Sequence, residues 1–476
     1  MSTYKKVAKN TTFILLGNVV VKILALFISI NLARYLGVEQ FGEYNFIITY
    51  LMFFAFIANF GMDPILIRDV ARFPSKTQTM MSNILVIRML TSFFAIALAI
   101  FFINLLNYPH EIFIYISIMS AILLFQGISY LFESLFQANL KMQYSAIGLI
   151  SSKVLYIVSV FILIYLHKPL IYFFYMYIIA EITRMLFATF YSRKFVQLNI
   201  DIDLEMWKYL FKQCLPFIVG YALFVIYYRV DILMLSKMQG NSAVGLYSAA
   251  YKITDPLLFL PGALASTMMP VMSKQYHENI SKLNYTYSLG SKYILQLMLP
   301  ITVGLYILSD KIISLLYTTD YVYSILTLQI LSLTLIFNSI NSIQSSLLTS
   351  SDRQKMNTVS VGICCLINVA LNILLIPKYS YNGAAIATLI SVILLFLIEL
   401  SFILKSFSFI PVNKESLKTV FSSLLMGLLL INLQDINIFV AIFICAVFYF
   451  ILLIILKSFS ENDYTMLQSL FKKKMS

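Results

Sequence analysis

Charged side chains interrupt several long apolar stretches of this chain. The basic residues inside such stretches are Lys22, Arg88, Lys153, Arg184, Arg229, Lys252 and Lys292. The acidic residues there are Asp63, Glu133, Glu181, Asp231, Asp255 and Glu399. A charge at the centre of a membrane span costs about 2.5–3.5 kcal/mol on insertion scales, so each of these groups is a functional candidate. The excess of cations favours an anionic ligand over a cationic one.

Position along the stretches divides these residues into two sets. Arg88, Glu133, Lys153, Glu181, Arg184 and Lys292 fall toward the inner third. Arg229, Asp231, Lys252 and Asp255 fall toward the outer third, with Lys22 near mid-depth. We hypothesise that the inner set admits the anion, that the outer set gates its release, and that Asp63, Asp231 and Asp255 serve coupling or gating. The alternative is that the acids neutralise neighbouring bases as structural pairs.

A stripe of polar residues follows the stretch at 323–349. It consists of Thr327, Thr334, Asn338, Asn341 and Ser345, which share one helical face. Asn338 and Asn341 are therefore candidates to line a cavity and bind ligand hydroxyl groups. The alternative is hydrogen bonding between helices, which contributes about 0.6 kcal/mol per bond in one membrane protein.

Membrane helices are the elements that must position these groups. Hydrophobic residues make up 60% of the 476 residues and charged residues 12%, whereas soluble proteins keep about a quarter charged. The apolar runs lack the period-two alternation of a membrane barrel. The sequence thus predicts an all-α integral membrane protein of about fourteen spans, at about 11–34, 43–67, 80–106, 112–137, 145–166, 169–191, 211–235, 245–271, 286–308, 323–349, 357–376, 382–404, 416–433 and 437–456.

The placement of Lys and Arg predicts the orientation. The first stretch is too long for a signal peptide and lacks a small-residue cleavage site, so we interpret it as a membrane helix. Most basic residues between spans fall on one side, and the other side holds only Arg34, Lys168, Lys237, Lys311 and Lys378. The basic side is cytoplasmic, so both termini of a multi-pass cell-membrane protein are expected there. The tail from Ser460 to Lys474 is predicted to be amphipathic.

Several other classes are not favoured. The net charge of +13 is scattered through short loops, so nucleic-acid binding is not expected. The cysteines, Cys214, Cys364, Cys365 and Cys445, have neither zinc nor disulfide spacing, and we expect no metal and no cofactor. No phosphate-binding loop of an ATP-driven pump occurs. Asp201 and Asp203 mimic a glycosyltransferase motif without a nucleotide-binding domain around them, so no enzyme is expected.

One short pattern occurs twice. Gly37, Gly42 and Tyr44 follow the first predicted span, and Gly240, Gly245 and Tyr247 follow the seventh in the same spacing. Glycine permits a tight turn between two long helices. Both copies follow a span that runs outward, so the halves are predicted to be parallel repeats about an axis along the membrane normal.

Three segments resemble signatures of the polysaccharide/O-antigen flippases in the multidrug/oligosaccharidyl-lipid/polysaccharide (MOP) exporter superfamily. They are Ala33–Tyr44 (ARYLGVEQFGEY), Gly61–Asp69 (GMDPILIRD) and Ile376–Thr388 (IPKYSYNGAAIAT). The resemblance implies two pseudo-symmetric six-helix lobes plus two C-terminal helices. We accordingly expect an N-terminal lobe at 1–200, a C-terminal lobe at 201–405, and two additional helices with the tail at 406–476.

The resemblance also implies a function. It is translocation of a polyprenyl-pyrophosphate-linked oligosaccharide to the outer leaflet by alternating access, for O-antigen, capsule or exopolysaccharide synthesis. Expected partners are this glycolipid, the bilayer, and a polysaccharide polymerase and glycosyltransferases. Three alternatives stay open: a cation-coupled multidrug exporter, a lipid II flippase and a membrane glycan polymerase. The multidrug exporter predicts twelve helices and acidic control of the cavity, and the polymerase predicts a sizeable external loop.

Overall fold

The computed structural model describes residues 3–199, 202–407 and 414–459, with side chains from Val19 onward except at position 414. Every regular element in these ranges is a helix, as the apolar composition predicts. The tail expected to be amphipathic, from Ser460 to Lys474, lies outside the described residues.

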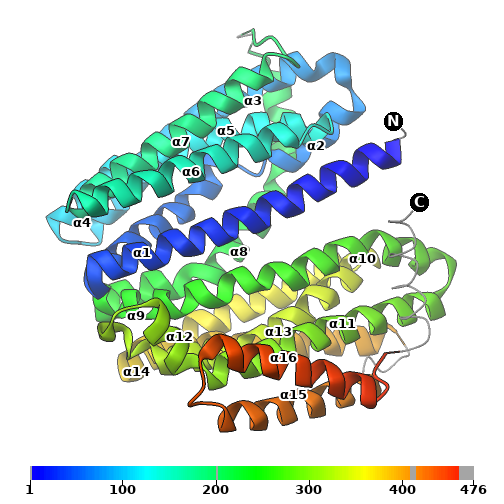
Figure 1. Ribbon diagram of the computed structural model, residues 1–476. Helices are drawn as coiled ribbons and strands as arrows, with labels where there is room; N and C mark the ends of the chain where they lie inside the picture. Colours follow the sequence, from blue (N-terminus) through cyan, green and yellow to red (C-terminus); the bar gives the residue numbers. More distant parts are fainter. Residues whose placement is uncertain (1–2, 200–201, 408–413, 460–476) are drawn as a thin grey trace. The chain divides into compact units, whose positions relative to one another are not determined.

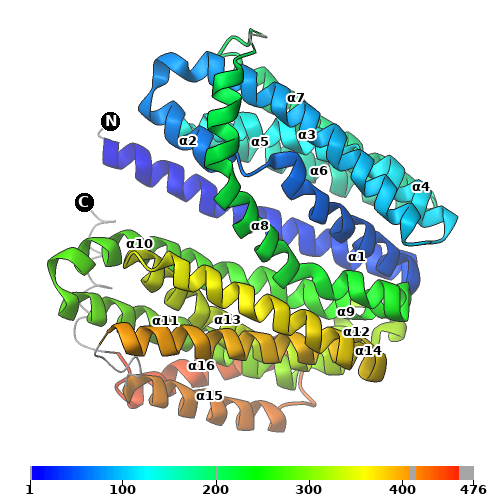
Figure 2. The same cartoon turned by 180° about the vertical axis from the view of Figure 1, so that it is seen from behind.

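The first part of the chain supplies nine helices and one short 3-10 turn within the described ranges. They are α1 (Thr3–Asn59), α2 (Asp63–Arg72), η1 (Pro74–Lys76), α3 (Thr77–Leu105), α4 (His110–Met119), α5 (Ile122–Ala138), α6 (Gln143–Tyr165), α7 (Leu170–Ser192), α8 (Leu204–Gln239) and α9 (Asn241–Thr254). Helices α3, α5, α6 and α7 run side by side in both ribbon views (Figures 1 and 2).

The second part supplies the remaining described elements. They are η2 (Asp255–Leu258), α10 (Phe259–Glu278), α11 (Ile280–Ile307), α12 (Ser309–Leu316), η3 (Thr319–Tyr321), α13 (Ser324–Ser350), α14 (Gln354–Ser406), α15 (Lys414–Asn432) and α16 (Ile438–Ile455). Helix α11 packs against α10, α13 and α15, and α15 packs against α16.

The number of described spans agrees with the expectation of about fourteen. Eleven helices are long and apolar enough to cross a membrane, and the bent pair Ile280–Ile307 and Ser309–Leu316 makes a twelfth if it forms one span. Two of these helices, α1 and α14, are each divided by a non-helical residue, Gly37 and Ser380. Each therefore contains two of the predicted spans.

Three predicted spans are interrupted. The stretch at 43–67 breaks after Asn59, since Phe60 and Gly61 have positive φ and α2 begins only at Asp63. The stretch at 112–137 is divided between α4 and α5. The stretch at 245–271 contains the 3-10 turn η2, which begins with Asp255 and a proline in its first turn. Hydropathy alone does not register such breaks, because the residues on either side remain apolar.

The chain forms two compact units, and each has its own apolar core. Unit 1 comprises Met1–Ala249 with Asn372–Tyr381, and unit 2 comprises Ala250–Leu371 with Asn382–Ser476. A core cluster in unit 1 joins residues of α2, α3, α5 and the start of α8, among them Ile65, Phe132 and Cys214. Clusters in unit 2 gather around α11, first with α10, α13 and the end of α14, then with α15 and α16. The predicted lobes at 1–200, 201–405 and 406–476 remain a prediction.

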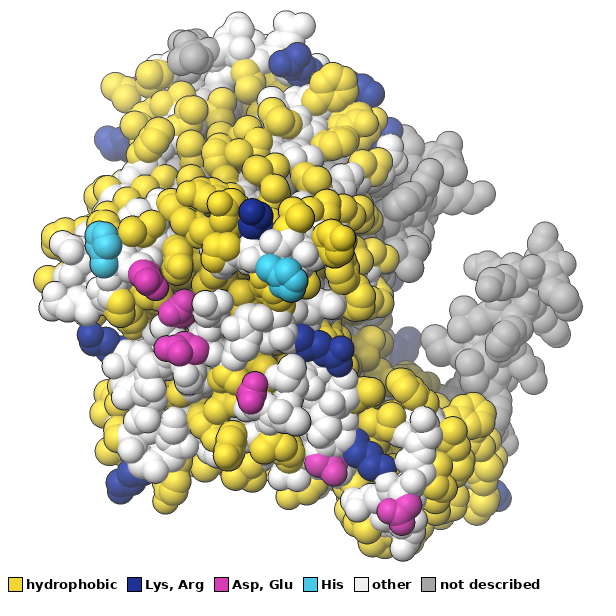
Figure 3. Space-filling view, turned by 60° about the vertical axis from the view of Figure 1, so that its left-hand side comes forward, with side chains coloured by type: hydrophobic (Ala, Val, Ile, Leu, Met, Phe, Trp, Pro, Cys, Tyr) yellow, Lys and Arg dark blue, Asp and Glu magenta, His cyan; other side chains and the backbone are white. Residues whose placement is uncertain are grey.

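Hydrophobic side chains cover much of the face shown in Figure 3. Large side chains such as Phe93, Phe94 and Phe443 are more than half exposed. A monomer in water rarely exposes so many large apolar side chains, since its largest apolar patch is about 300–600 Å². Lipid is the medium in which such a surface is stable.

The repeated glycine pattern has the same backbone conformation in both copies, which lie within unit 1. Gly37 has φ 72° and ψ 179°, and Gly240 has φ 83° and ψ 178°, a region that only glycine adopts readily. The second glycine of each copy, Gly42 and Gly245, lies inside a helix. The expectation of a turn glycine is thus right for the first position and wrong for the second, which permits close helix contact.

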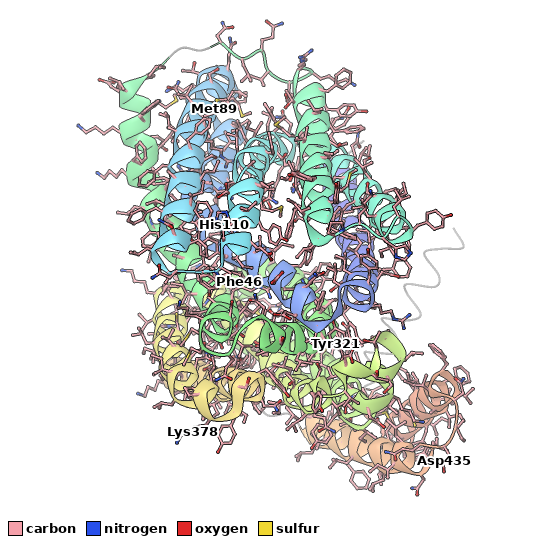
Figure 4. All side chains as sticks on the ribbon, turned by 90° about the vertical axis from the view of Figure 1, so that its left-hand side faces the viewer. Phe46, Met89, His110, Tyr321, Lys378 and Asp435 are labelled. Atoms are coloured by element: carbon pink, nitrogen blue, oxygen red, sulfur yellow. The ribbon has the colours of Figure 1, made fainter. Side chains whose placement is uncertain are left out.

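The loop between α3 and α4 is fastened to the end of α8 within unit 1. Burial raises the pKa of Tyr108, so its hydroxyl stays protonated at neutral pH and donates to Ser236 Oγ at 3.3 Å. Lys237 Nζ donates to the carbonyl oxygen of Leu106 at 2.7 Å. The ring of Phe46 stacks on Tyr108 at 4.9 Å between centroids, and Figure 4 shows Phe46 near His110, the first residue of α4.

Candidate functional site

Arg88 and Asp63, predicted to serve ligand binding and coupling respectively, form one ion pair in unit 1. Arg88 on α3 is fully buried and also donates from Nη1 to the carbonyl oxygen of Gly127 at 2.7 Å. Asp63 also accepts from Ser134 Oγ at 2.9 Å. The charge of Arg88 is thus neutralised inside the protein, and the 33% exposed side chain of Asp63 is the accessible end of the pair.

The turn before α2 positions Asp63. Gly61 has φ 64°, and a Cβ at this position would lie 3.0 Å from Phe217 Cβ and 3.1 Å from Ile218 N. The glycine therefore allows both the turn and the close packing of α8. Proline follows Asp63 in the first turn of α2, where its missing N–H costs no hydrogen bond. The carboxylate of Asp63 is favoured at a helix N-terminus by the helix dipole.

A second buried network joins α5, α6 and α7. Arg184 donates from Nε and Nη2 to the two carboxylate oxygens of Glu133, both at 2.8 Å. Its Nη1 lies 3.5 Å from Glu181, whose other oxygen lies 3.8 Å from Lys153 Nζ. Arg184 also lies over the ring of Tyr130, 4.7 Å from its centroid. The two cations of this network thus neutralise its two anions. This arrangement agrees with the alternative that these acids and bases form structural pairs.

Lys292 on α11 is paired as well. Its Nζ lies 3.0 Å from Glu415 Oε2, and the lysine is 1% exposed. Glu415 belongs to α15, so the pair joins these two helices inside unit 2. Glu415 was absent from the predicted partners because it falls just outside the apolar stretch at 416–433.

The predicted outer set is divided between the two units. Arg229 and Asp231 lie on α8 in unit 1, whereas Lys252 and Asp255 belong to unit 2. Asp231 is buried and accepts hydrogen bonds from the Tyr247 hydroxyl and the N–H of Ile232. Asp255 begins η2 and accepts from Tyr251 at 3.3 Å. Asp231 thus holds the tyrosine of the second glycine copy, a contact that the sequence pattern did not predict.

Lys22 differs from the other buried cations. It is half-buried on α1. Among residues with described side chains, it has no hydrogen-bond or ion-pair partner. Keeping an unpaired ammonium within a membrane span costs free energy that no contact of the described structure offsets. Lys22 is therefore the strongest candidate of the predicted set for a ligand contact.

The polar stripe on α13 mainly makes contacts with neighbouring helices in unit 2. Thr327 donates to Asn382 Oδ1 at 2.8 Å, and Asn341 donates to the carbonyl oxygen of Val392 at 3.3 Å. Asn357 donates to Ser345 Oγ at 2.6 Å. Hydrogen bonding between helices thus accounts for the stripe at these positions. Asn338 and Asn341 remain predicted ligand residues.

An apolar cavity of about 330 Å³ lies beside α11 in unit 2. Its lining comes from α11, α12, α15 and α16 and includes Pro300, Gly304, Met426, Ala446 and Phe450. The predicted polar residues are absent from this lining. A cavity with such walls accepts an apolar chain and gives no partner to a charge.

Sequence reasoning missed the contact that fastens the start of α8 to α3. Asn83 Oδ1 accepts both the indole N–H of Trp207 and the backbone N–H of Asp203, each at 2.8 Å. Tyr209, two residues further along α8, donates to Asp69 Oδ2 at 2.9 Å. The only available signal was the tryptophan itself, because a buried indole usually finds an acceptor.

Two family models match the chain. One, described as polysaccharide biosynthesis protein, matches residues 7–277, and the other, described as MatE, matches residues 216–374. An uncharacterized membrane protein, MJ1068, of Methanocaldococcus jannaschii is 24% identical over 261 residues, 54% of this chain and 52% of that protein. The probable low-salt glycan biosynthesis flippase Agl15 of Haloferax volcanii is 25% identical over 166 residues, 35% of each chain. The matched segments thus span about half or less of these relatives.

Solved structures show the same fold. The lipid II flippase MurJ in an inward closed conformation has a TM-score of 0.76 at 22% identity, over 92% of this chain and 97% of that one. An inward-facing multidrug resistance MATE family transporter of the MOP superfamily has a TM-score of 0.64 at 15% identity, over 81% and 95%. At these identities the similarity establishes the fold.

Proposed function

This chain belongs to the polysaccharide biosynthesis protein family, and from that premise we propose that it is a flippase for a polyprenyl-pyrophosphate-linked oligosaccharide. The family match over more than half of the chain is the observation that carries the proposal. The glycolipid moves from the inner to the outer leaflet of the cell membrane and supplies the synthesis of a surface polysaccharide. A glycosyltransferase acts before this step and a polymerase after it.

Lys22 supports the pyrophosphate part of the proposal. Two phosphates cannot enter an apolar membrane interior without cations that replace their hydration. Arg88, Arg184 and Lys292 are already engaged with carboxylates, so they first serve to hold helices together. Lys22 has no such engagement among the described side chains, and we assign it the first contact with the pyrophosphate. Arg229 and Lys252 serve its later release.

The cavity beside α11 supports the lipid part. Transfer of each CH₂ group of a polyprenyl chain from an apolar medium to water costs about 0.8 kcal/mol of free energy. The chain must therefore stay in apolar surroundings throughout transport. The walls of the cavity at Pro300, Met426 and Phe450 provide such surroundings. We propose that this cavity holds part of the chain while the pyrophosphate crosses.

Alternating access requires a contact that closes the outer side and then opens. The two glycine copies contact each other, since a Cβ on Gly42 would lie 1.8 Å from the backbone oxygen of Asn241. The Lys and Arg distribution predicts that the spans end on the outer side there. We propose that this contact separates when the cargo is released outward. Asp231, which binds Tyr247 of the second copy, is placed to bias the separation, in keeping with the coupling or gating role assigned to it with Asp63 and Asp255.

Two alternatives within the superfamily have specific support. The MatE match over residues 216–374 favours a cation-coupled multidrug exporter. The similarity in fold to the lipid II flippase MurJ favours lipid II as the second alternative cargo. The neutralised pairs around Arg88, Arg184 and Lys292 leave less net positive charge than the sequence suggested, so charge alone does not decide among these cargoes.

A transport assay with the reconstituted protein distinguishes among these three cargoes. The purified protein is placed in liposomes with a fluorescent polyprenyl-pyrophosphate oligosaccharide, and the fraction accessible to a membrane-impermeant quencher is followed with time. Parallel liposomes contain fluorescent lipid II or a cationic dye, and protein-free liposomes provide the baseline. We expect the oligosaccharide lipid to move above baseline. Movement of lipid II alone, or dye transport without movement of either lipid, would contradict the proposal.

A further inference from the structure

Glu399 is a carboxylic acid buried within unit 2. It lies on the second arm of α14, inside the apolar stretch at 382–404, and is 1% exposed. Its Oε2 atom has no hydrogen-bond partner among the described residues, and no lysine, arginine or histidine of that part of the chain forms an ion pair with it. It thus contrasts with Glu133, Glu181 and Glu415, which all face cations.

The surroundings of Glu399 are polar but uncharged. Tyr287 on α11 and Cys364 on the first arm of α14 interact electrostatically with it. Tyr287 is in turn close to Ser291 and Gln344, both buried. Ser291 Oγ and both amide atoms of Gln344 lack partners that meet hydrogen-bond geometry. Unsatisfied buried polar atoms on adjacent helices point to a missing small ligand, such as a proton on the acid or a water molecule.

Two cations on neighbouring elements of unit 2 contact other partners. Lys292, on the same helix as Tyr287, pairs with Glu415. Arg353, just before α14, stacks on Phe407 at 4.7 Å. Helix α13 contains no titratable residue, and the titratable groups that interact electrostatically with Glu399 are Tyr287 and Cys364, whose side chains are ordinarily neutral near pH 7.

We propose that Glu399 is a proton-binding site and that its protonation controls the packing of α14 against α11 and α13. A buried carboxylate without a cation is strongly unfavourable, whereas the neutral acid needs only hydrogen bonds. Loss of the proton therefore favours an arrangement in which the inner end of this helix group admits water. Ile403, one turn beyond Glu399, packs in the same core cluster as Tyr287 and Leu347, so hydration there separates these helices.

The coupling of this proton to transport rests on the proposed function, but proton binding does not. A ligand that binds one of two conformations more tightly shifts the equilibrium toward it, and the reverse holds by linkage. Proton binding at Glu399 accordingly favours the closely packed arrangement. A change in the arrangement during transport would take up or release the proton.

Infrared spectroscopy of the purified full chain in lipid nanodiscs tests the binding. Wild type and Glu399→Gln are compared across a pH series, with Glu278→Gln as the matched control, because Glu278 is in the same unit with a side chain 59% exposed. We expect the carbonyl band of a protonated carboxylic acid in wild type and in the control at neutral pH. The band should be absent in Glu399→Gln and should disappear from wild type at alkaline pH.

Two results would overturn the proposal. If wild type and Glu399→Gln give the same spectrum in the protonated-acid region at every pH at which both are folded, Glu399 carries no proton. If the band of wild type stays constant up to alkaline pH, the site neither takes up nor releases a proton. Transport is measured separately in the liposome assay. A titrating band without movement of any lipid would leave the site standing and remove the flippase function.

Discussion

Gly42 and Gly245 occupy equivalent places in the two copies of the repeat, and each meets a backbone carbonyl of the other copy. A Cβ on Gly42 would lie 1.8 Å from the oxygen of Asn241, and a Cβ on Gly245 would lie 2.0 Å from the oxygen of Val38. Asn241 and Val38 are themselves equivalent, so the contact is reciprocal. Such reciprocity is what a twofold relation between repeats produces, and it makes both glycines necessary for the contact.

Gly42→Ala and Gly245→Ala are each expected to force the two copies apart. Overpacking of this kind costs about 1–3 kcal/mol, so the apparent melting temperature in detergent should fall. Gly262→Ala is the control, because a Cβ there has nothing within 4 Å. If the contact closes the outer side, an added Val38→Cys should react faster with a thiol reagent in the alanine variants, over a low background from the buried native cysteines. Unchanged reactivity with lowered stability would show a purely structural contact.

The Arg88–Asp63 pair predicts an asymmetric pattern of stability. Asp63→Ala leaves the fully buried Arg88 without its carboxylate, and breaking a buried pair in this way costs about 3–5 kcal/mol. The double variant Arg88→Leu with Asp63→Leu removes both charges and should recover much of that loss. Denaturation of wild type, Asp63→Ala and the double variant in the same detergent measures these differences in stability. A double variant no more stable than the single one would show that Arg88 makes its main contribution elsewhere.

A charge exchange distinguishes the two roles considered for Lys292. Lys292→Glu places a second carboxylate beside Glu415 and should lower stability and transport together. Adding Glu415→Lys restores an ion pair with reversed charges between α11 and α15. If the lysine is structural, we expect the double variant to fold and to move lipid at a rate within about threefold of wild type, or less than about 1 kcal/mol. A folded double variant without transport would show that Lys292 contacts the cargo.

Trp207 is the only tryptophan of the chain and reports directly on the docking of α8. Asn83→Ala removes the acceptor of two N–H donors, at a cost of about 1–3 kcal/mol. The emission of Trp207 should shift to longer wavelength as the indole meets water. Ser82→Ala is the control, because the buried Ser82 hydroxyl has no hydrogen-bond partner among the described residues. An unshifted spectrum in Asn83→Ala would mean that neighbouring apolar contacts alone hold the indole.

The spans were predictable because a membrane helix needs only about 20 apolar residues, which hydropathy registers directly. The interruptions of these spans were less predictable from the sequence. The break at Gly61 and the turn that begins with Asp255 depend on backbone conformation inside apolar runs. The repeat was visible in the spacing of Gly37 and Gly42, yet the role of Gly42 depends on a contact about two hundred residues away in sequence.

The site residues were found as a set, but their pairing was not predictable. Which of two faces a charge occupies depends on the rotation of each helix, and apolar runs without strong periodicity leave that rotation open. Arg184 therefore had no assigned partner from the sequence, although its bidentate contact with Glu133 is well aligned. Lys22 differs from the others already in the sequence, because its predicted span at 11–34 contains no acidic residue.

Movement of the oligosaccharide lipid by Lys22 variants tests the central claim most directly. Wild type, Lys22→Arg and Lys22→Ala are reconstituted in equal amounts, and the rate of fluorescent lipid movement is measured after folding is verified. A hydrogen-bonded contact with a charged group is worth about 1.5–3 kcal/mol, so Lys22→Ala should be about tenfold or more slower, whereas Lys22→Arg should retain most of the activity. Wild-type movement by Lys22→Ala would contradict the account.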